Sequence, residues 1–310
     1  MSPTSPEAVA AAQVPHAGQL VLDHVGHFVP HADAASAALE KLGFMLTPFS
    51  EQSHRVEPGG PLTPAGAGNR CVMLQQGYLE FLTPTADTPV ASQLRASIKR
   101  YVGPHLIAFG TAAPEADHER LRNAGFSPLE PVALQREIGT GAGTETARFT
   151  VVRVPPETMV EGRIQFCQHH TPGLVWQERW THHLNRATGL AGVILRVPDA
   201  REAAQRFARY TGLLAQVSGS VWRITTARGY LAFVDRHTLH RRLGIVPPAV
   251  PWIAGCALRS GDINASGEYL RLSGVPVHVL GSRRLLVVLP PAVGGIVIFE
   301  PTDAGMLSFD

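Results

Sequence analysis

The apolar and polar positions of this chain repeat one order four times. Each copy opens with a short apolar strand, continues after a turn into an amphipathic helical stretch, and then reaches a glycine. The copies cover residues 22–44, 105–126, 190–213 and 253–275, and their glycines are Gly43, Gly125, Gly212 and Gly274. A glycine just after a helical pattern ends the helix, because glycine takes the left-handed conformation without strain. The pattern therefore predicts four strand–helix units.

About three strand-like runs, broken by glycine and proline, follow each helical stretch. One run of the first unit, GYLEF at 77–81, is nearly repeated as GYLAF at 229–233. Self-similarity at regular distances indicates one structural unit used several times. The sequence thus predicts an α+β chain of four tandem βαβββ modules. The alternative, an α+β chain with accidental similarity, leaves the matching glycine positions unexplained.

The length and the repeats together divide the chain. A chain of 310 residues suggests about two domains. We expect a disordered tail over 1–18, an N-terminal domain of two modules over 19–173, a connector over 174–189, and a C-terminal domain of two modules over 190–310. Trp176 and Trp180 of the connector are expected to be structural.

Composition narrows the classes of partner. The chain is 45% hydrophobic and 17% charged with a net charge of +2, which suits a soluble globular protein and offers no basic face for nucleic acid. No apolar run approaches the roughly 18 residues of a membrane span. Cys71, Cys167 and Cys256 lie far apart, which argues against a disulfide framework and against a thiolate zinc site. We therefore expect a cytoplasmic protein that binds neither nucleic acid nor membrane.

Glu80 raises a question of its own. It stands in the predicted strand YLEFL among large apolar residues, and a buried carboxylate is costly unless something pairs with it. A bound cation would offset that cost. The alternative is an arginine partner such as Arg70 or Arg163, with nearby histidines as ordinary core residues.

The segments LDHVGHFVP at 22–30 and GYLEFLTP at 77–84, set in tandem βαβββ modules, resemble the vicinal oxygen chelate superfamily. This group includes glyoxalase I, the extradiol dioxygenases and the bleomycin-resistance proteins. The resemblance covers about residues 20–302, nearly the whole chain. It implies that the modules pair into two half-barrel-like cups, one of which surrounds a divalent metal.

The resemblance also implies the metal ligands. The first strands of modules one and two would supply His24 and His105, and the last strands Glu80 and Gln165. The same positions in modules three and four hold Gly192, Ala232, Gly255 and Val297, which cannot bind a metal. The C-terminal half is therefore expected to be a degenerate partner that stabilises the active half, closes the cup or mediates assembly, for example into a homodimer.

The expected function is that of a glyoxalase-like lyase or isomerase, acting on a small metabolite whose vicinal oxygens chelate one divalent ion of Fe, Mn, Ni, Co or Zn, without a nucleotide cofactor. Glutamine cannot take a proton, so Glu80 is the catalytic candidate, with His54 of the loop after the first helix as a further one. Two alternatives stay open. One is an Fe(II) extradiol-type dioxygenase, since two histidines and a carboxylate form its triad. The other is a non-catalytic small-molecule-binding protein.

Overall fold

A computed structural model describes residues 10–55, 60, 62–141, 143–235, 238–240, 244–281, 283–305 and 307. The N-terminal half contains β1 (Val21–Phe28), α2 (Ala32–Lys41), β2 (Ser50–Arg55), β3 (Leu62–Met73), β4 (Tyr78–Pro84), α3 (Pro89–Arg100), β5 (Gly103–Gly110), α4 (Pro114–Asn123), β6 (Val132–Thr140), β7 (Gly143–Arg153) and β8 (Arg163–His169). The short helical turn Pro156–Thr158 precedes β8, and two more, α5 (Pro172–Val175) and Glu178–Trp180, lie between β8 and the second half.

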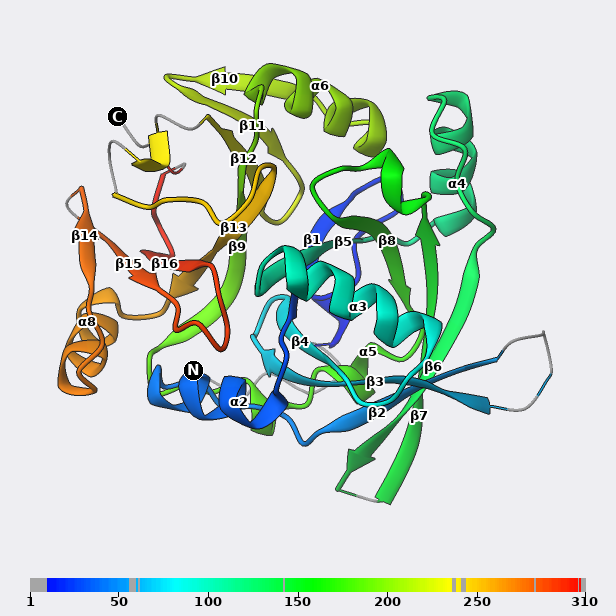
Figure 1. The fold of residues 1–310 in the computed structure, drawn as a ribbon, viewed down its shortest axis with the longest axis horizontal. Helices are drawn as coiled ribbons and strands as arrows, with labels where there is room; N and C mark the ends of the chain where they lie inside the picture. The colour runs from blue at the N-terminus through cyan, green and yellow to red at the C-terminus, as the bar shows by residue number, and fades with distance from the viewer. Residues whose placement is uncertain are drawn as a thin grey trace.

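The C-terminal half contains β9 (Ala187–Arg196), α6 (Ala200–Thr211), β10 (Ala215–Ser218), β11 (Val221–Thr225), β12 (Tyr230–Val234), β13 (Trp252–Ser260), α8 (Ile263–Leu272), β14 (His278–Leu280), β15 (Arg284–Val288) and β16 (Ile296–Pro301). The two halves lie side by side (Figure 1). The mixed α+β class expected from the pattern is confirmed.

The N-terminal sheet is a closed barrel, which differs from the half-open cup that was expected. Its strand order is β1-β4-β3-β2-β6-β7-β8-β5. The ring closes where Ser53 of β2 pairs with Gln135 of β6, because the long β6–β7 hairpin reaches across to β2. The C-terminal sheet has the order β10-β11-β12-β9-β13-β16-β15-β14 and stays open.

The two faces of the barrel wall have different surroundings. Val25, Leu79, Phe81 and Ile107 face outward into the main core, which also holds side chains of α2, α4 and the C-terminal half. Alternate residues such as His24, Tyr78 and Glu80 therefore face the interior. Helix α3 crosses one end of the barrel (Figure 1), where its Leu94 packs with inward residues of the strands.

The halves share one core. Tyr210 of α6 stacks on Phe166 of β8 with ring centroids 5.1 Å apart, and its hydroxyl donates to the Ile164 carbonyl at 2.8 Å. Arg206 of α6 pairs at 2.7 Å with Glu161, whose side chain is 1% exposed. Such contacts fix the C-terminal half against the barrel.

The predicted helix ends are confirmed. Gly43, Gly125, Gly212 and Gly274 have φ of 83°, 81°, 73° and 68°. At Gly212 the backbone N–H returns to the Ala208 carbonyl and closes α6, whose other end is capped by the Asp199 side chain. The glycines therefore end the helices by backbone geometry.

Residues 10–18 differ from the tail that was expected. Gln13 is 2% exposed, and its amide donates to the Gln75 carbonyl at 2.6 Å and accepts from the Gly77 N–H at 3.2 Å. These contacts join the segment to the loop between β3 and β4. The rest of the expected tail, residues 1–9, lies outside the described residues. No helix in the described part of the chain is both long and apolar enough to span a membrane.

Candidate functional site

The interior of the barrel is lined by polar groups from β1, β4 and β8. The central pairs bring His24 of β1 opposite Tyr78 of β4 on one side and opposite Ala108 of β5 on the other. Ala108 in turn pairs with Gln165 of β8. One row of the inner face therefore reads Tyr78, His24, Ala108, Gln165.

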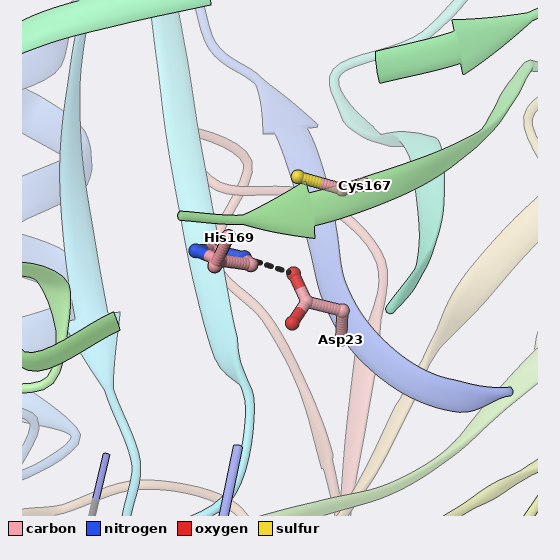
Figure 2. Close-up of side chains that lie close together, drawn as sticks. All are labelled: Asp23, Cys167 and His169. Carbon is pink, nitrogen blue, oxygen red and sulfur yellow. Dashed lines mark hydrogen bonds and ion pairs between the residues drawn. The ribbon is translucent and has the colours of Figure 1, made fainter. Parts of the chain in front are cut away.

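Asp23 is the centre of a buried network at this row. Its Oδ2 accepts from His24 Nδ1 at 2.6 Å and from His169 Nε2 at 3.0 Å. Asp23 is fully buried, and the side chains of both histidines are 5% exposed. Figure 2 shows Asp23 from β1 and His169 from β8 pointing toward one another.

The electrostatics of Asp23 follow from its partners. Burial by itself raises the pKa of Asp23, but the charge and hydrogen bond of His169, followed by those of His24, bring that pKa well below its ordinary value. The carboxylate is therefore ionised at neutral pH, and each histidine donates one ring N–H to it. A carboxylate behind His24 holds that ring in one tautomer and one orientation, as for a metal-bound or proton-transferring histidine.

Cys167 completes a group with the donor chemistry of a cation site. One ligand atom each of Asp23, Cys167 and His169 lie within 4.8 Å of one another, and these residues form the one such group among the described residues. Asp23 Oδ1 and His169 Nδ1 are buried without a hydrogen-bond partner in the described structure. Oxygen, nitrogen and sulfur donors together fit a divalent transition metal or zinc.

The thiol of Cys167 is protonated in these surroundings. Burial raises the pKa of Cys167 well above its ordinary value, and the charges of Asp23 and Glu80 raise it further. The same influences raise the pKa of Tyr78. Both groups thus lie within electrostatic reach of both carboxylates, and a bound cation would reverse the effect on the thiol.

Glu80 is paired by amides. Asn69 Nδ2 makes a short hydrogen bond to Glu80 Oε1, and Gln52 Nε2 donates to the same oxygen at 3.4 Å. Arg136 Nη1 donates to Asn69 Oδ1 at 3.4 Å. Neither arginine considered from the sequence, Arg70 or Arg163, forms an ion pair with Glu80 within the described residues.

The predicted ligands His24, Glu80 and Gln165 all face the barrel interior. Glu80 pairs with Gly26, two positions along from His24 on the neighbouring strand, and both side chains lie on the same face. Gln165 lies opposite Arg153 of β7. Whether these side chains bind a metal stays a prediction.

His105 does not join them. The β1–β5 register shifts between Gly26 and His27, where their partners are Leu106 and Pro104, so His105 is an unpaired bulge residue. Its Nε2 bonds the Tyr101 carbonyl at 2.8 Å, and its ring stacks on Tyr101 at 3.9 Å. The matching bulge on β1 is Asp23, between Leu22 and His24. By the strand pairing His105 therefore corresponds to Asp23, and Leu106 corresponds to His24.

Two other positions named from the sequence are His54 and Trp176. His54 belongs to β2, and its side chain lies outside the described residues. Trp176 of the connector is 1% exposed and packs against Tyr78 and His169 at ring-centroid distances of 5.7 and 4.8 Å. It covers the barrel beside the Asp23 network.

Asp23, Cys167 and His169 are not among the ligands that were predicted from the sequence. Adjacent strand residues normally point to opposite faces, so neighbouring Asp23 and His24 were not expected to interact. The bulge at Asp23 lets its carboxylate accept a hydrogen bond from His24. Cys167 and His169 are two apart on β8 and share a face, so Cys-x-His was the available signal. The wide spacing of the three cysteines argues only against sites built from several thiolates, and a mixed site needs just one cysteine.

Several solved structures have a similar architecture. A hypothetical protein from Staphylococcus aureus has a similar structure, with a TM-score of 0.63, 11% identity, and coverage of 91% of this chain and 99% of that one. A mutant of 4-hydroxymandelate synthase from Streptomyces coelicolor gives 0.53 at 13% identity, with 94% of each chain covered. A xylose isomerase-like TIM barrel/4-hydroxyphenylpyruvate dioxygenase fusion protein gives 0.57 at 12% identity, covering 95% of this chain and 51% of that one. At these identities the likeness defines the fold, which is that of the vicinal oxygen chelate superfamily.

The family follows from the sequence itself. The glyoxalase-like domain model matches residues 22–211, more than half of the chain. This protein belongs to the glyoxalase-like domain family. No match was found among curated protein sequences.

Proposed function

We propose that this chain is a divalent-metal-dependent enzyme of the lyase or isomerase type, acting from the interior of the N-terminal barrel on a small metabolite with vicinal oxygen atoms. One observation carries the proposal. The buried Asp23 carboxylate, the Cys167 thiol and the His169 imidazole converge within 4.8 Å, next to His24 and on the same inner face as Glu80. Superfamily membership supports the use of a metal there.

The proposed cation ligands are Asp23, Cys167 and His169. For an ion to bind, the proton that His169 Nε2 donates to Asp23 Oδ2 would have to leave. The two atoms are 3.0 Å apart, which is close to the spacing of two ligands that share one ion with bonds of about 2.0–2.1 Å. A thiolate in the set favours zinc or cobalt over harder ions. When bound, the ion would act as a Lewis acid that polarises a substrate oxygen.

Glu80, Arg136 and His24 would have separate roles toward the substrate. Glu80, oriented by Asn69 and Gln52, would take a proton from the substrate carbon next to the polarised oxygen. The guanidinium of Arg136, whose Nη1 bonds Asn69, would attract an anionic substrate group toward the carboxylate. Asp23 holds His24, so that His24 Nε2 stays available to donate or accept a hydrogen bond on the substrate.

The test is metal analysis with cobalt substitution of protein purified without an affinity tag. We expect about one zinc or cobalt per chain, with a thiolate-to-cobalt charge-transfer band in the near ultraviolet. Cys167→Ser should abolish the band. Cys256→Ser, which changes an equally buried cysteine of the other half, should retain it. Glu80→Gln should keep the metal and lose turnover in a screen of 2-oxoaldehydes and acyl-CoA esters.

Other outcomes point elsewhere. Metal that is lost in Glu80→Gln and unaffected in Cys167→Ser would support the ligand set predicted from the sequence. Iron lost in air together with activity would support the extradiol dioxygenase alternative. Absence of metal even after reconstitution would overturn the enzyme proposal and favour a small-molecule-binding protein.

A further inference from the structure

A buried guanidinium that forms no ion pair with any described residue lies in the C-terminal sheet. Arg223 on β11 is 2% exposed, and its Nε and Nη1 have no hydrogen-bond partner among the described residues. Arg223 shares its strand face with Val221, which packs with Tyr230, Ala232 and Ile298. This side, opposite α6, is the inner face of the C-terminal sheet. An unpaired buried cation is costly, so the position calls for an anion.

A second unpartnered donor lies beside it. The Tyr230 hydroxyl is buried and has no partner within the described chain, and Arg223 Cζ lies 5.7 Å from the centroid of the Tyr230 ring. The ring crosses Gly192, where any Cβ would clash with it. The Tyr230 ring can therefore lie across the sheet only because residue 192 is a glycine.

Positive charge dominates around these donors. The charged groups that act on Tyr230 are Arg223, Arg259 and Arg284 against one carboxylate, Glu300. Glu300 is 2% exposed and is already engaged by Arg284 Nε at 3.1 Å. The inner face thus carries an excess of buried or partly buried positive charge that Glu300 does not neutralise.

The small residues of this half explain how the site is built. Gly192 pairs with Tyr230, and Ala232 pairs with Arg223. These are two of the positions expected to be silent because they cannot bind a metal. Their small size leaves room for a guanidinium and a phenol on the same face. The C-terminal half therefore has polar donors beside the positions that cannot bind a metal.

We propose that the C-terminal sheet binds a small organic carboxylate, with the anion on Arg223 and the Tyr230 hydroxyl. Val221, Leu286 and Ile298 belong to the same buried apolar cluster as Tyr230, so the anion would be bound next to apolar side chains. The apolar surroundings favour an organic anion over an inorganic one. The site requires no metal and is independent of the function proposed for the barrel.

Calorimetric titration with benzoate at low salt tests the proposal, with benzamide as the neutral analogue of the same shape. We expect one benzoate per chain, no heat with benzamide, and at least a tenfold loss of affinity in Arg223→Met and in Tyr230→Phe. Arg209→Met, which changes an exposed arginine of α6, should bind as the wild type does. If Arg223→Met fails to fold, Arg223→Lys and Tyr230→Phe carry the test.

The barrel variants separate the two proposals. Cys167→Ser and Glu80→Gln should bind benzoate normally, whatever they do to metal content or turnover. Benzoate binding that disappears in those variants and survives in Arg223→Met would overturn the C-terminal site. Absence of benzoate binding to the folded wild-type protein at millimolar ligand would overturn it as well.

Discussion

Mild acid should destabilise this protein through one buried imidazole. His27 on β1 points away from the barrel interior, is fully buried, and has no hydrogen-bond partner on either ring nitrogen among the described residues. Its ring packs on Phe81 with centroids 4.8 Å apart. Burial, followed by the charge of His105, lowers the pKa of His27 from 6.5 to about 3.

The sign and size follow from proton linkage. Between pH 6.5 and about 3 the unfolded chain binds a proton at His27 and the folded chain does not, so the free energy of unfolding decreases as the pH falls. Each pH unit in this window corresponds to about 1.4 kcal/mol. Going from pH 7 to pH 5 should therefore remove about 2 kcal/mol through His27 alone.

Urea unfolding at both pH values provides the assay. His27→Phe should lose about 2 kcal/mol less than the wild type between pH 7 and pH 5, whereas His278→Gln, at an exposed position on β14, should behave as the wild type. His105 and His183, whose pKa values burial lowers to about 4, remain in all three proteins and cancel. An equal loss in the three proteins would refute the neutral buried imidazole.

Three further predictions concern buried partners. Asn69→Ala should lower the free energy of unfolding by about 1–3 kcal/mol, because Glu80 loses its closest donor while staying buried; an unchanged urea midpoint would contradict this. Arg206→Met should cost about 3–5 kcal/mol by leaving Glu161 buried and unpaired, and adding Glu161→Gln should recover much of that loss in a double-mutant cycle. Gly294→Ala should destabilise the contact between the halves, because the residue has φ of 68° and an added Cβ would clash with a carbonyl of the N-terminal half. A melting temperature equal to that of the wild type would argue against that contact.

The elements were largely predictable because they depend on local signals. Helix ends depend on a glycine that can take positive φ, and the inward direction of Glu80 follows from alternation along one strand. The apolar neighbours of Glu80 correctly raised the question of its partner. They could not name that partner, because Asn69 lies on another strand and Gln52 on a third.

The sequence by itself determined the order of strands and helices and the helix ends, since periodicity and glycine conformation act within a few residues, whereas the set His24, Glu80 and Gln165 came from the family resemblance. Only the tertiary structure decided which groups meet. A bulge puts Asp23 beside His24, another turns His105 toward Tyr101, and the strand order β1-β5-β8 brings Cys167 and His169 close to Asp23. A shift of one residue in register reverses the face of every side chain that follows, and local sequence carries no record of it.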